Sequence, residues 1–362
     1  MNHISLLNRQ FFGVLSMRLK NEICEMLNIE YPIIQAPMAG GITTPELVAG
    51  VANSGALGSL AAGYLSPSEI RTAIRKIKTL TKKPFAVNLF IPEKHHATHQ
   101  QIKNACADIQ NSCQELSIKI EPASPPYAPV FEEQMNVVIE ENIPIMSFTF
   151  GLLDAHWIEK LKNKHVKLIG TATHLAEAQL LENSGIDIII AQGMEAGGHR
   201  GTFLGNAEKK LFLLNDLISR FSNEMKIPVI AAGGIMNSEH LKLVMQLGAS
   251  GAQMGTAFLT CAESGATSNY KKFLLSQTND QTVLTRAFSG KYARGINNKF
   301  IQRMSDKNIL DYPIQNALTN LMRKVAKEKG DGDFMSLWAG TGVKHSIETS
   351  ASELIKKLTS VF

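Results

Sequence analysis

Short apolar runs alternate with helical patterns along most of this chain, and no other feature limits its possible folds as much. Nearly all of these runs are apolar on both faces, which is typical of a parallel sheet covered by helices on both sides. Eight such units are the number that closes a (β/α)8 TIM barrel. We therefore predict an α/β fold of this barrel type, with an open doubly wound sheet as the alternative. The runs span residues 32–36, 56–60, 84–90, 143–148, 166–170, 186–191, 227–232 and 251–254.

Interruptions of this alternation indicate the domain organisation. An insertion over about residues 91–140 follows the third strand and holds two helical patterns, separated by the proline-rich stretch 122–129. After the eighth strand the strand pattern disappears, so we expect helices and loops packed on the barrel. The predicted parts are a flexible N-terminal extension over residues 1–20, a barrel over 21–265 and a C-terminal helical region over 266–362. Barrel helices are expected at 45–54, 66–80, 154–162, 175–184, 209–221 and 238–247.

Composition narrows the class of partner. Of the 362 residues, 44% are hydrophobic and 19% are charged, which argues against a disordered or fibrous chain. A net charge of +5 over the whole chain gives little support for nucleic acid or a membrane surface as a partner. No stretch reaches the roughly 20 apolar residues that a bilayer span requires. We expect a small-molecule partner, for which a nucleotide phosphate is adequate, and a monomer or homodimer.

Neither the N-terminus nor the cysteines indicate a targeting signal, a disulfide or a metal site with any strength. Residues 1–20 contain no Asp or Glu, but they lack the long apolar core and the cleavage site of a secretory signal. An organelle transit peptide fits slightly better, yet we favour a flexible extension, or Met17 as the working initiator, and a cytoplasmic protein. The four cysteines form no Cys-x-x-Cys pair, and the three histidines within 95–99 lack a second ligand cluster, so no metal site is expected.

Glycine-rich turns after the last two predicted strands point to a bound phosphate. Glycine lets backbone N–H groups approach a phosphate closely, and loops after strands seven and eight are the usual phosphate site of such barrels. Simple turn glycines are the alternative, but two such turns on adjacent strands favour a ligand. The residues expected to contact it are Gly233, Gly234, Gly255 and Thr256, and Gln253 and Met254 at the end of the eighth strand are expected to bind the same ligand.

A loop with four glycines in nine residues follows the sixth strand, over residues 193–201. It carries His199, the only residue here that titrates near neutrality, and a histidine at the carboxyl end of a barrel strand indicates catalysis. The amide of Gln192 can both donate and accept, which suits the edge of a heterocycle. Glu195 is ambiguous, since it could orient a loop amide as easily as take part in chemistry.

Two further strand ends are candidates for ligand contact. The first strand runs into Ala36, Pro37 and Met38, where small residues and a rigid proline leave room for a flat ligand. Asn88 is a lone polar residue in the third strand, and a buried amide needs partners. It can satisfy the barrel backbone or bind a ligand.

Together these motifs resemble the nitronate monooxygenase family, formerly called 2-nitropropane dioxygenases. The resemblance covers the chain from about Leu27 onward. The motifs that carry it are Gln35-Ala-Pro-Met38, Asn88, Ser147-Phe-Thr-Phe-Gly151, Gly170-Thr-Ala-Thr173, Gln192-Gly-Met-Glu-Ala-Gly-Gly-His199, Ala231-Ala-Gly-Gly234, Gln253-Met-Gly-Thr256, Phe288-Ser-Gly290, Ala293-Arg-Gly-Ile296 and Leu337-Trp-Ala-Gly340.

This resemblance implies an FMN-dependent TIM barrel and assigns the predicted residues to parts of the cofactor. Ala36, Pro37 and Met38 would lie along the isoalloxazine ring. Asn88 and Gln192 would form hydrogen bonds to the flavin.

The phosphate end follows in the same way. The resemblance implies that Gly197 backs the FMN. Gly233, Gly234, Gly255 and Thr256 would hold its phosphate, which agrees with the glycine turns identified above.

The implied reaction is oxidation of an alkyl nitronate, with propionate 3-nitronate as the usual substrate, by O2 to a carbonyl compound and nitrite. His199 would face the substrate, either as a general base or as a cation that stabilises the nitronate. Lys291, Arg294 and Lys299 are candidates, by position only, for binding the substrate carboxylate.

Two departures from the family pattern concern the substrate. Where relatives often carry Thr after Gly-Thr-Ala-Thr, this chain has His174, a second titratable group for the barrel mouth. Thr149 replaces a histidine that some relatives carry, and so removes a possible substrate contact.

The main alternative is another enzyme on the same scaffold, an FMN-dependent NAD(P)H reductase of the enoyl-acyl-carrier-protein or quinone type. Gln192, where an acidic residue is expected in the enoyl reductases, argues against it, as does Leu337-Trp-Ala-Gly340. A barrel that binds a phosphate ligand without catalysis is less favoured, because the histidine loop is intact.

Overall fold

Eight parallel strands form a barrel at the centre of the computed structural model, which describes residues 20–360. The expected extension over residues 1–20 therefore lies outside the described residues, apart from Lys20. Backbone hydrogen bonds between Gln35 and Leu57 and between Leu57 and Ile33, each 2.9 Å long, join the first strand to the second and close the ring. In order around the barrel, the strands are β1 (Ile33–Gln35), β9 (Gly251–Met254), β8 (Val229–Ala232), β6 (Ile188–Gln192), β5 (Lys167–Ala172), β4 (Ile145–Thr149), β3 (Phe85–Phe90) and β2 (Gly58–Ala61).

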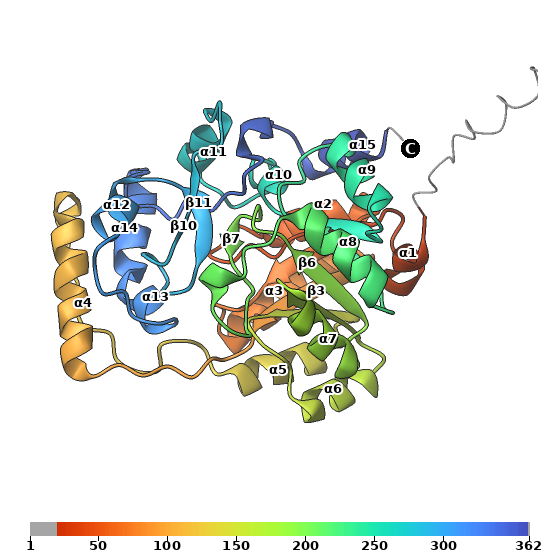
Figure 1. Ribbon diagram of the computed structural model, residues 1–362, viewed down its shortest axis with the longest axis horizontal. Coiled ribbons are helices and arrows are strands. Elements are labelled where there is room, and N and C mark those ends of the chain that lie inside the picture. The colour runs from red at the N-terminus through yellow and green to blue at the C-terminus, as the bar shows by residue number, and fades with distance from the viewer. Residues whose placement is uncertain (1–19, 361–362) are drawn as a thin grey trace, which may run out of the picture.

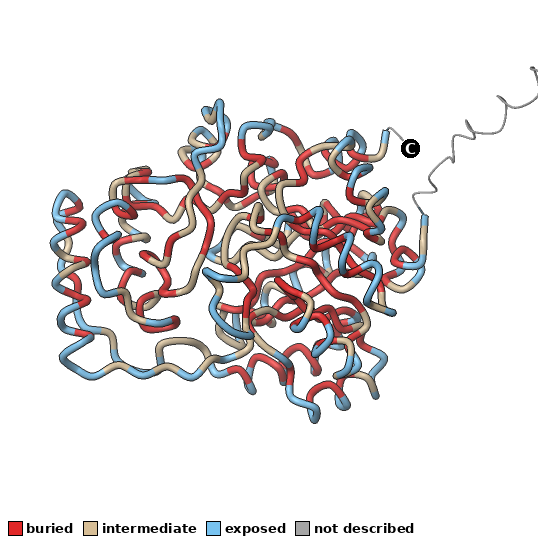
Figure 2. Tube along the Cα trace, viewed as in Figure 1, coloured by how far each residue is buried: buried red, intermediate tan, exposed pale blue. Residues whose placement is uncertain are grey.

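The structure confirms the eight predicted barrel strands. Their side chains are buried on both faces of the sheet, which explains why the strands are apolar throughout. Side chains such as Ile34, Ile145 and Ile190 fill the interior, whereas Val87 and Leu168 pack outward against helices. Figure 2 shows the strands as the most continuously buried part of the chain. The surrounding helices are α1 (Glu22–Leu27), α2 (Pro45–Asn53), α3 (Pro67–Leu80), α5 (Phe131–Glu140), α6 (Ala155–Lys162), α7 (Leu175–Asn183), α8 (Leu214–Glu224), α9 (Ser238–Gln246), α10 (Thr256–Leu259) and α15 (Ala351–Thr359).

Local signals explain where most helices begin. Ser66 and Glu69 form a capping box at the start of α3, and Asn237 caps α9 through the backbone N–H of His240. The prediction for α8 was wrong by several residues, since this helix begins at Leu214 and not at residue 209. Its first N–H donates to the carboxylate of Glu195, a partner that lies outside the local sequence.

The insertion after β3 reaches over to the C-terminal region. Its first helix, α4 (His99–Ser112), lies beside the helices of that region at the left of Figure 1. Ile102 and Ile109 of α4 belong to the same buried cluster as Phe300 and Met322. The C-terminal helices are α11 (Ser268–Leu275), α12 (Lys299–Arg303), α13 (Ile314–Leu318) and α14 (Asn320–Lys329).

The expectation that only helices and loops follow the eighth barrel strand was wrong. β10 (Thr282–Thr285) and β11 (Ala293–Ile296) form an antiparallel sheet with β7 (Gly198–His199), in the order β10-β11-β7. β11 reads Ala-Arg-Gly-Ile and lacks an apolar pattern, so its pairing depends on the distant loop and not on local propensity. This sheet attaches the C-terminal region to the loop that carries His199.

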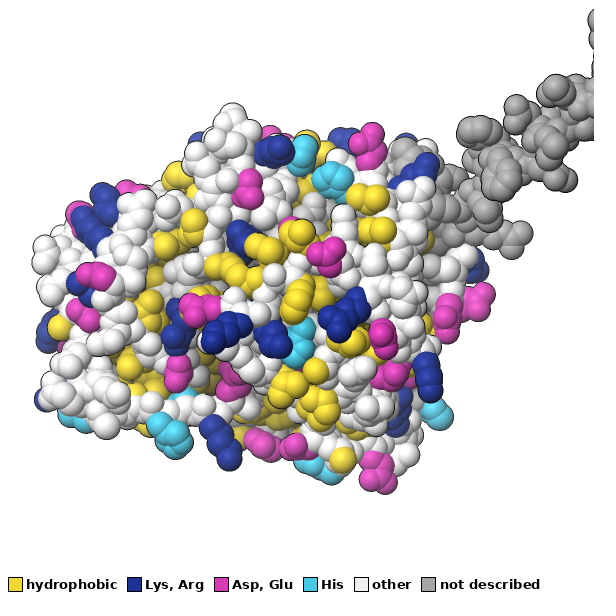
Figure 3. All heavy atoms as spheres, in the orientation of Figure 1, with side chains coloured by type: hydrophobic (Ala, Val, Ile, Leu, Met, Phe, Trp, Pro, Cys, Tyr) yellow, Lys and Arg dark blue, Asp and Glu magenta, His cyan; other side chains and the backbone are white. Residues whose placement is uncertain are grey.

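The surface carries charged side chains of both signs. Basic and acidic side chains are interspersed on the face shown in Figure 3. Among the described residues, no helix combines the length and apolar character needed to cross a bilayer.

Candidate active site

A cavity of about 420 Å³ opens at the carboxyl ends of the barrel strands. This volume is in the range of sites for small molecules and cofactors, roughly 300–1,000 Å³. Parallel strands present all their carboxyl ends on one side of the barrel, so residues that lie far apart in the sequence meet there. His199 and all the residues that the sequence predicts as cofactor ligands line this cavity. They are Ala36, Pro37, Met38, Asn88, Gln192, Gly197, His199, Gly233, Gly234, Gln253, Met254, Gly255 and Thr256.

The two glycine turns leave backbone donors available on one side of the cavity. Gly233 and Gly234 adopt φ values of 136° and 67°, which L side chains rarely allow. Among the described residues, the N–H groups of Gly234, Gly255 and Thr256 have no hydrogen-bond acceptor. A Cβ atom at position 255 would lie 3.5 Å from Ala36, an ordinary contact, so the protein itself does not exclude a side chain there. These features suit a ligand that approaches the backbone and accepts several hydrogen bonds.

At Gly197 a side chain would collide with the protein backbone itself. A Cβ atom at this position would lie 2.5 Å from the nitrogen of Gly340 and 2.6 Å from the carbonyl carbon of Ala339. The histidine loop thus packs directly against the C-terminal segment that contains Trp338. This close approach explains why both segments are rich in small residues.

The two predicted amides have different surroundings. Asn88 donates to Ser147 at 3.0 Å, and its Oδ1 has no partner among the described residues, so it can accept from a ligand. Gln192 donates to the carbonyl oxygen of His199 at 2.9 Å and accepts from Gly201 at 2.7 Å. Gln192 therefore also holds the histidine loop in place.

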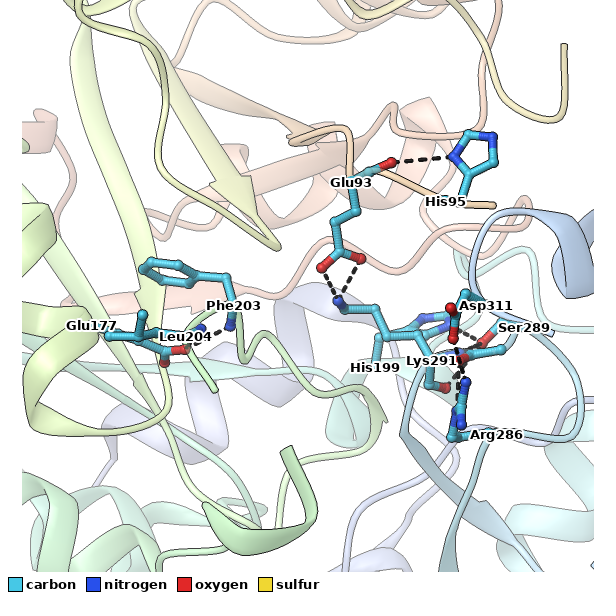
Figure 4. A network of polar contacts seen from close by, with 11 residues as sticks. Glu93, His95, Glu177, His199, Phe203, Leu204, Arg286, Ser289, Lys291 and Asp311 are labelled. Atoms are coloured by element: carbon cyan, nitrogen blue, oxygen red, sulfur yellow. Dashed lines mark hydrogen bonds and ion pairs between the residues drawn. The ribbon is translucent and has the colours of Figure 1, made fainter. Parts of the chain in front are cut away.

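His199 lies against the cavity with one ring nitrogen engaged. Its Nε2 is 2.8 Å from the hydroxyl oxygen of Ser289, as Figure 4 shows. Burial lowers the pKa of His199 to about 3, and the positive charges of Lys291 and Arg323 contribute to that shift. The imidazole is therefore neutral at physiological pH. Ser289 lies within the Phe-Ser-Gly motif of the sequence, but nothing in that motif indicated a contact with His199.

Aromatic rings form a continuous wall beside the imidazole. The ring centroids of Tyr64 and Phe90 are 5.3 Å apart, and those of Phe90 and Phe150 are 4.7 Å apart. Phe150 then contacts His199 at 5.8 Å, and Trp338 lies on another side of the imidazole at 5.5 Å. Such a wall makes the cavity largely apolar and keeps bulk water from the imidazole.

The positive charge at the cavity comes from helix α14 and not from the predicted residues. Arg323, Lys324 and Lys327 line the cavity, and no Asp or Glu among residues 20–360 does. The sequence does not show which of the many cations in the C-terminal segment 266–330 face inward. The packing of α14 decides this.

None of the three basic residues proposed from the sequence lines this cavity. Lys291 pairs with Glu93 at 2.6 Å and lies 4.5 Å from the ring centroid of Phe150. Arg294 is buried and donates to the carbonyl oxygen of Met194, and Lys299 forms surface ion pairs. The expectation that these cations bind substrate in this cavity was therefore wrong.

Two titratable residues have structural partners instead of lining the cavity. Glu195 accepts from the N–H of Leu214 at the start of α8, so the loop-orienting alternative is correct. His174 is buried 3.5 Å from Glu177 and donates toward the carbonyl oxygen of Leu204. The expectation that His174 lies near the substrate was wrong, because it stabilises the segment that follows β7. Thr149 does line the cavity.

Among the described residues, no group of three or more His, Cys, Asp or Glu side chains is arranged to hold a metal ion. The polar groups that line the cavity include the imidazole of His199, the amides of Asn88 and Gln192 and the backbone of the glycine turns. The sequence profile described as "Nitronate monooxygenase" matches residues 20–360.

The chain belongs to the nitronate monooxygenase family. A probable nitronate monooxygenase from Staphylococcus saprophyticus is 43% identical over 346 residues, covering 94% of this chain and 97% of that relative. The crystal structure of nitroalkane oxidase from Streptomyces ansochromogenes has a TM-score of 0.88 and 34% identity, and covers 93% of this chain and 97% of that one. FabK from Thermotoga maritima is less similar, with a TM-score of 0.74, 27% identity and coverage of 94% and 95%.

These comparisons confirm the resemblance inferred from the sequence motifs. This member of the nitronate monooxygenase family is an oxidoreductase that acts on nitronates, and the family is one of flavoenzymes. The match also covers the C-terminal region, which holds the helices and strands that complete the cavity.

Proposed function

We propose that this enzyme binds FMN in the cavity and oxidises alkyl nitronates, with propionate 3-nitronate as the representative substrate. O2 is the co-substrate, and the products are a carbonyl compound and nitrite. The observation that carries this proposal is the meeting of the two glycine turns and His199 in one cavity. We also propose that the enzyme acts in the cytoplasm as a monomer or homodimer.

The residues present fit FMN. Unpartnered N–H groups at Gly234, Gly255 and Thr256 suit the phosphate, and the open Oδ1 of Asn88 suits an N–H of the ring system. Ala36 and Met38 offer a small and a polarisable surface for the flat ring. When bound, FMN supplies the redox chemistry and the reactivity toward O2.

We assign His199 the role of a neutral general base. With Nε2 occupied by Ser289, the free nitrogen Nδ1 can accept the α-proton of a nitroalkane. The lowered pKa supports a neutral resting imidazole and argues against a permanent cation at this position. The nitronate anion produced next to the ring would stabilise the imidazolium that forms.

The second candidate is an FMN-dependent NAD(P)H reductase, which the likeness to FabK favours. The chain shares its fold with enzymes of both kinds, so a chemical test is needed. The two functions differ in which compound reduces the flavin.

Anaerobic absorbance titration of the yellow protein separates these functions. We expect propionate 3-nitronate to bleach the flavin band, and nitrite to form when air is admitted. Rapid bleaching by NADH or NADPH with no response to the nitronate would assign the enzyme to the reductases. A colourless protein that cannot be reconstituted with FMN would overturn the cofactor assignment.

A further inference from the structure

The cavity contains a second set of unsatisfied donors that the proposed reaction does not use. The hydroxyl oxygen of Tyr64, in the loop after β2, is buried and has no hydrogen-bond partner. Arg323 on α14 donates from Nη2 to the carbonyl and side-chain oxygens of Asn316, at 2.8 and 2.9 Å. Its Nε lies 3.3 Å from Thr319 Oγ1, whereas Nη1 has no acceptor among the described residues. Both residues line the cavity.

Arg323 is also a cation without a protein counterion. Within the described part of the chain it forms no ion pair, and no carboxylate lines the cavity. Removing a guanidinium from water without an anionic partner is unfavourable, so such an arrangement is typical of a site completed by an anionic ligand. Its contacts with Asn316 and Thr319 fix the side chain and leave Nη1 for that ligand.

The position of this donor pair relative to His199 limits what the ligand can be. Tyr64 and His199 stand at opposite ends of the aromatic wall formed by Phe90 and Phe150. A substrate lying along this wall can place one group at the imidazole and a second group at Tyr64 and Arg323. The glycine turns already supply donors for a phosphate, which leaves this pair for the substrate.

We propose that Arg323 Nη1 and Tyr64 Oη bind a carboxylate on the carbon chain of the nitronate, so that the enzyme selects nitronates with this second anionic group. This inference rests on the proposed function. In place of Lys291, Arg294 and Lys299, it assigns the carboxylate to two half-buried residues, Tyr64 in the loop between β2 and α3 and Arg323 on α14.

Substrate pairs that differ only in the carboxylate test the proposal. We compare propionate 3-nitronate with propyl-1-nitronate in the holoenzyme and in Arg323→Met and Tyr64→Phe. Loss of a charge-assisted hydrogen bond should raise KM for the carboxylate substrate about 10- to 100-fold in Arg323→Met, and less in Tyr64→Phe. KM for propyl-1-nitronate should change less than about twofold. The matched control is Arg220→Met, an exposed arginine on α8 without an ion pair in the described structure.

A binding measurement separates this inference from the proposed function. Succinate carries a second carboxylate and butyrate does not, and binding of either can be followed by the flavin spectrum without turnover. We expect wild-type holoenzyme to bind succinate at least about tenfold more tightly than butyrate, and Arg323→Met to lose that preference.

Several results would overturn the inference. Equal KM changes for both nitronates in Arg323→Met, or an unchanged succinate preference, would show that Arg323 does not bind the carboxylate. Loss of FMN from Arg323→Met would assign the guanidinium to the cofactor. If Arg323→Met fails to fold, the isosteric Tyr64→Phe variant still reports on the site. If wild type oxidises neither nitronate but prefers succinate, the proposed function fails and the anion site stands.

Discussion

The imidazole Nε2 of His199 lies 2.8 Å from the hydroxyl oxygen of Ser289, a residue 90 positions further along the chain. The same hydroxyl is 3.1 Å from the carbonyl oxygen of Lys291, to which it donates, and it accepts from the N–H of Lys291 at 3.3 Å. Since a hydroxyl has one proton, this arrangement satisfies all three groups only when His199 donates from Nε2. The tautomer with a free lone pair on Nδ1 is thereby favoured.

Removing the hydroxyl should therefore slow proton transfer without affecting the cofactor. We predict that Ser289→Ala lowers kcat for a neutral nitroalkane about tenfold, the effect of losing one hydrogen bond of ~1.4 kcal/mol. Stopped-flow reduction of the flavin measures this step, and the pH profile should shift because the neighbour of the imidazole has changed. Ser305→Ala, at an exposed serine after α12, is the control. An unchanged rate and pH profile in Ser289→Ala would contradict the assigned tautomer.

His199→Asn should keep FMN and lose most turnover of neutral nitroalkanes. General-base catalysis contributes about 10²- to 10⁴-fold, so the rate should fall within that range. Preformed nitronates need no proton removal and should be less affected. Flavin absorbance of the purified variant measures cofactor retention, and nitrite release measures turnover. Loss of FMN from this variant would count against placing His199 on the substrate side.

A side chain at Gly234, in the turn after β8, should interfere with ligand binding as well as strain the backbone. Gly185 has a similar φ away from the cavity, so it serves as a control for the strain alone. Gly234 and Gly185 have φ values of 67° and 87°, so a side chain is strained at both. A Cβ atom at 234 would meet Glu195 at 3.3 Å beside the cavity, whereas at 185 it meets nothing within 4 Å.

We predict that Gly234→Leu loses FMN during gel filtration and that Gly185→Leu retains it. Backbone strain of this kind costs about 1–3 kcal/mol, and thermal unfolding should show similar losses of stability in the two variants. Normal FMN retention by Gly234→Leu would exclude this turn from the phosphate site.

The buried imidazole should also make stability depend on pH. The pKa of His199 is lowered from 6.5 to about 3 in the folded chain, so the unfolded chain binds one more proton between these values. The contribution of His199 to stability is therefore intact above pH 6.5 and is lost as the pH falls toward 3, at a slope of up to about 1.4 kcal/mol per pH unit. Urea unfolding of wild type and His199→Asn at several pH values measures this slope. Parallel curves for the two proteins between pH 6 and 4 would show that His199 is not desolvated in the folded state.

Much of the fold could be predicted because its signals are local. The eight strands are apolar on both faces, as burial inside a barrel requires, and the helix starts carry their own caps, as Ser66 and Glu69 do. The short strands β10 and β11 could not be predicted in this way. Their residues pair with each other and with the distant β7, and an Ala-Arg-Gly-Ile segment has no pattern of its own.

The sequence alone determined the barrel and the residues that meet at its carboxyl end, including His199 and the turns at Gly234 and Gly255. Strand ends of a parallel barrel must converge, so their order along the chain is enough to bring these residues together. Tertiary structure alone decided which side chains of the C-terminal region complete the cavity. Ser289 and Arg323 reach it, whereas Lys291 and Lys299 pair with Glu93 and Glu115. The pairing of β11 with β7 and the packing of α14 in the C-terminal region set these orientations.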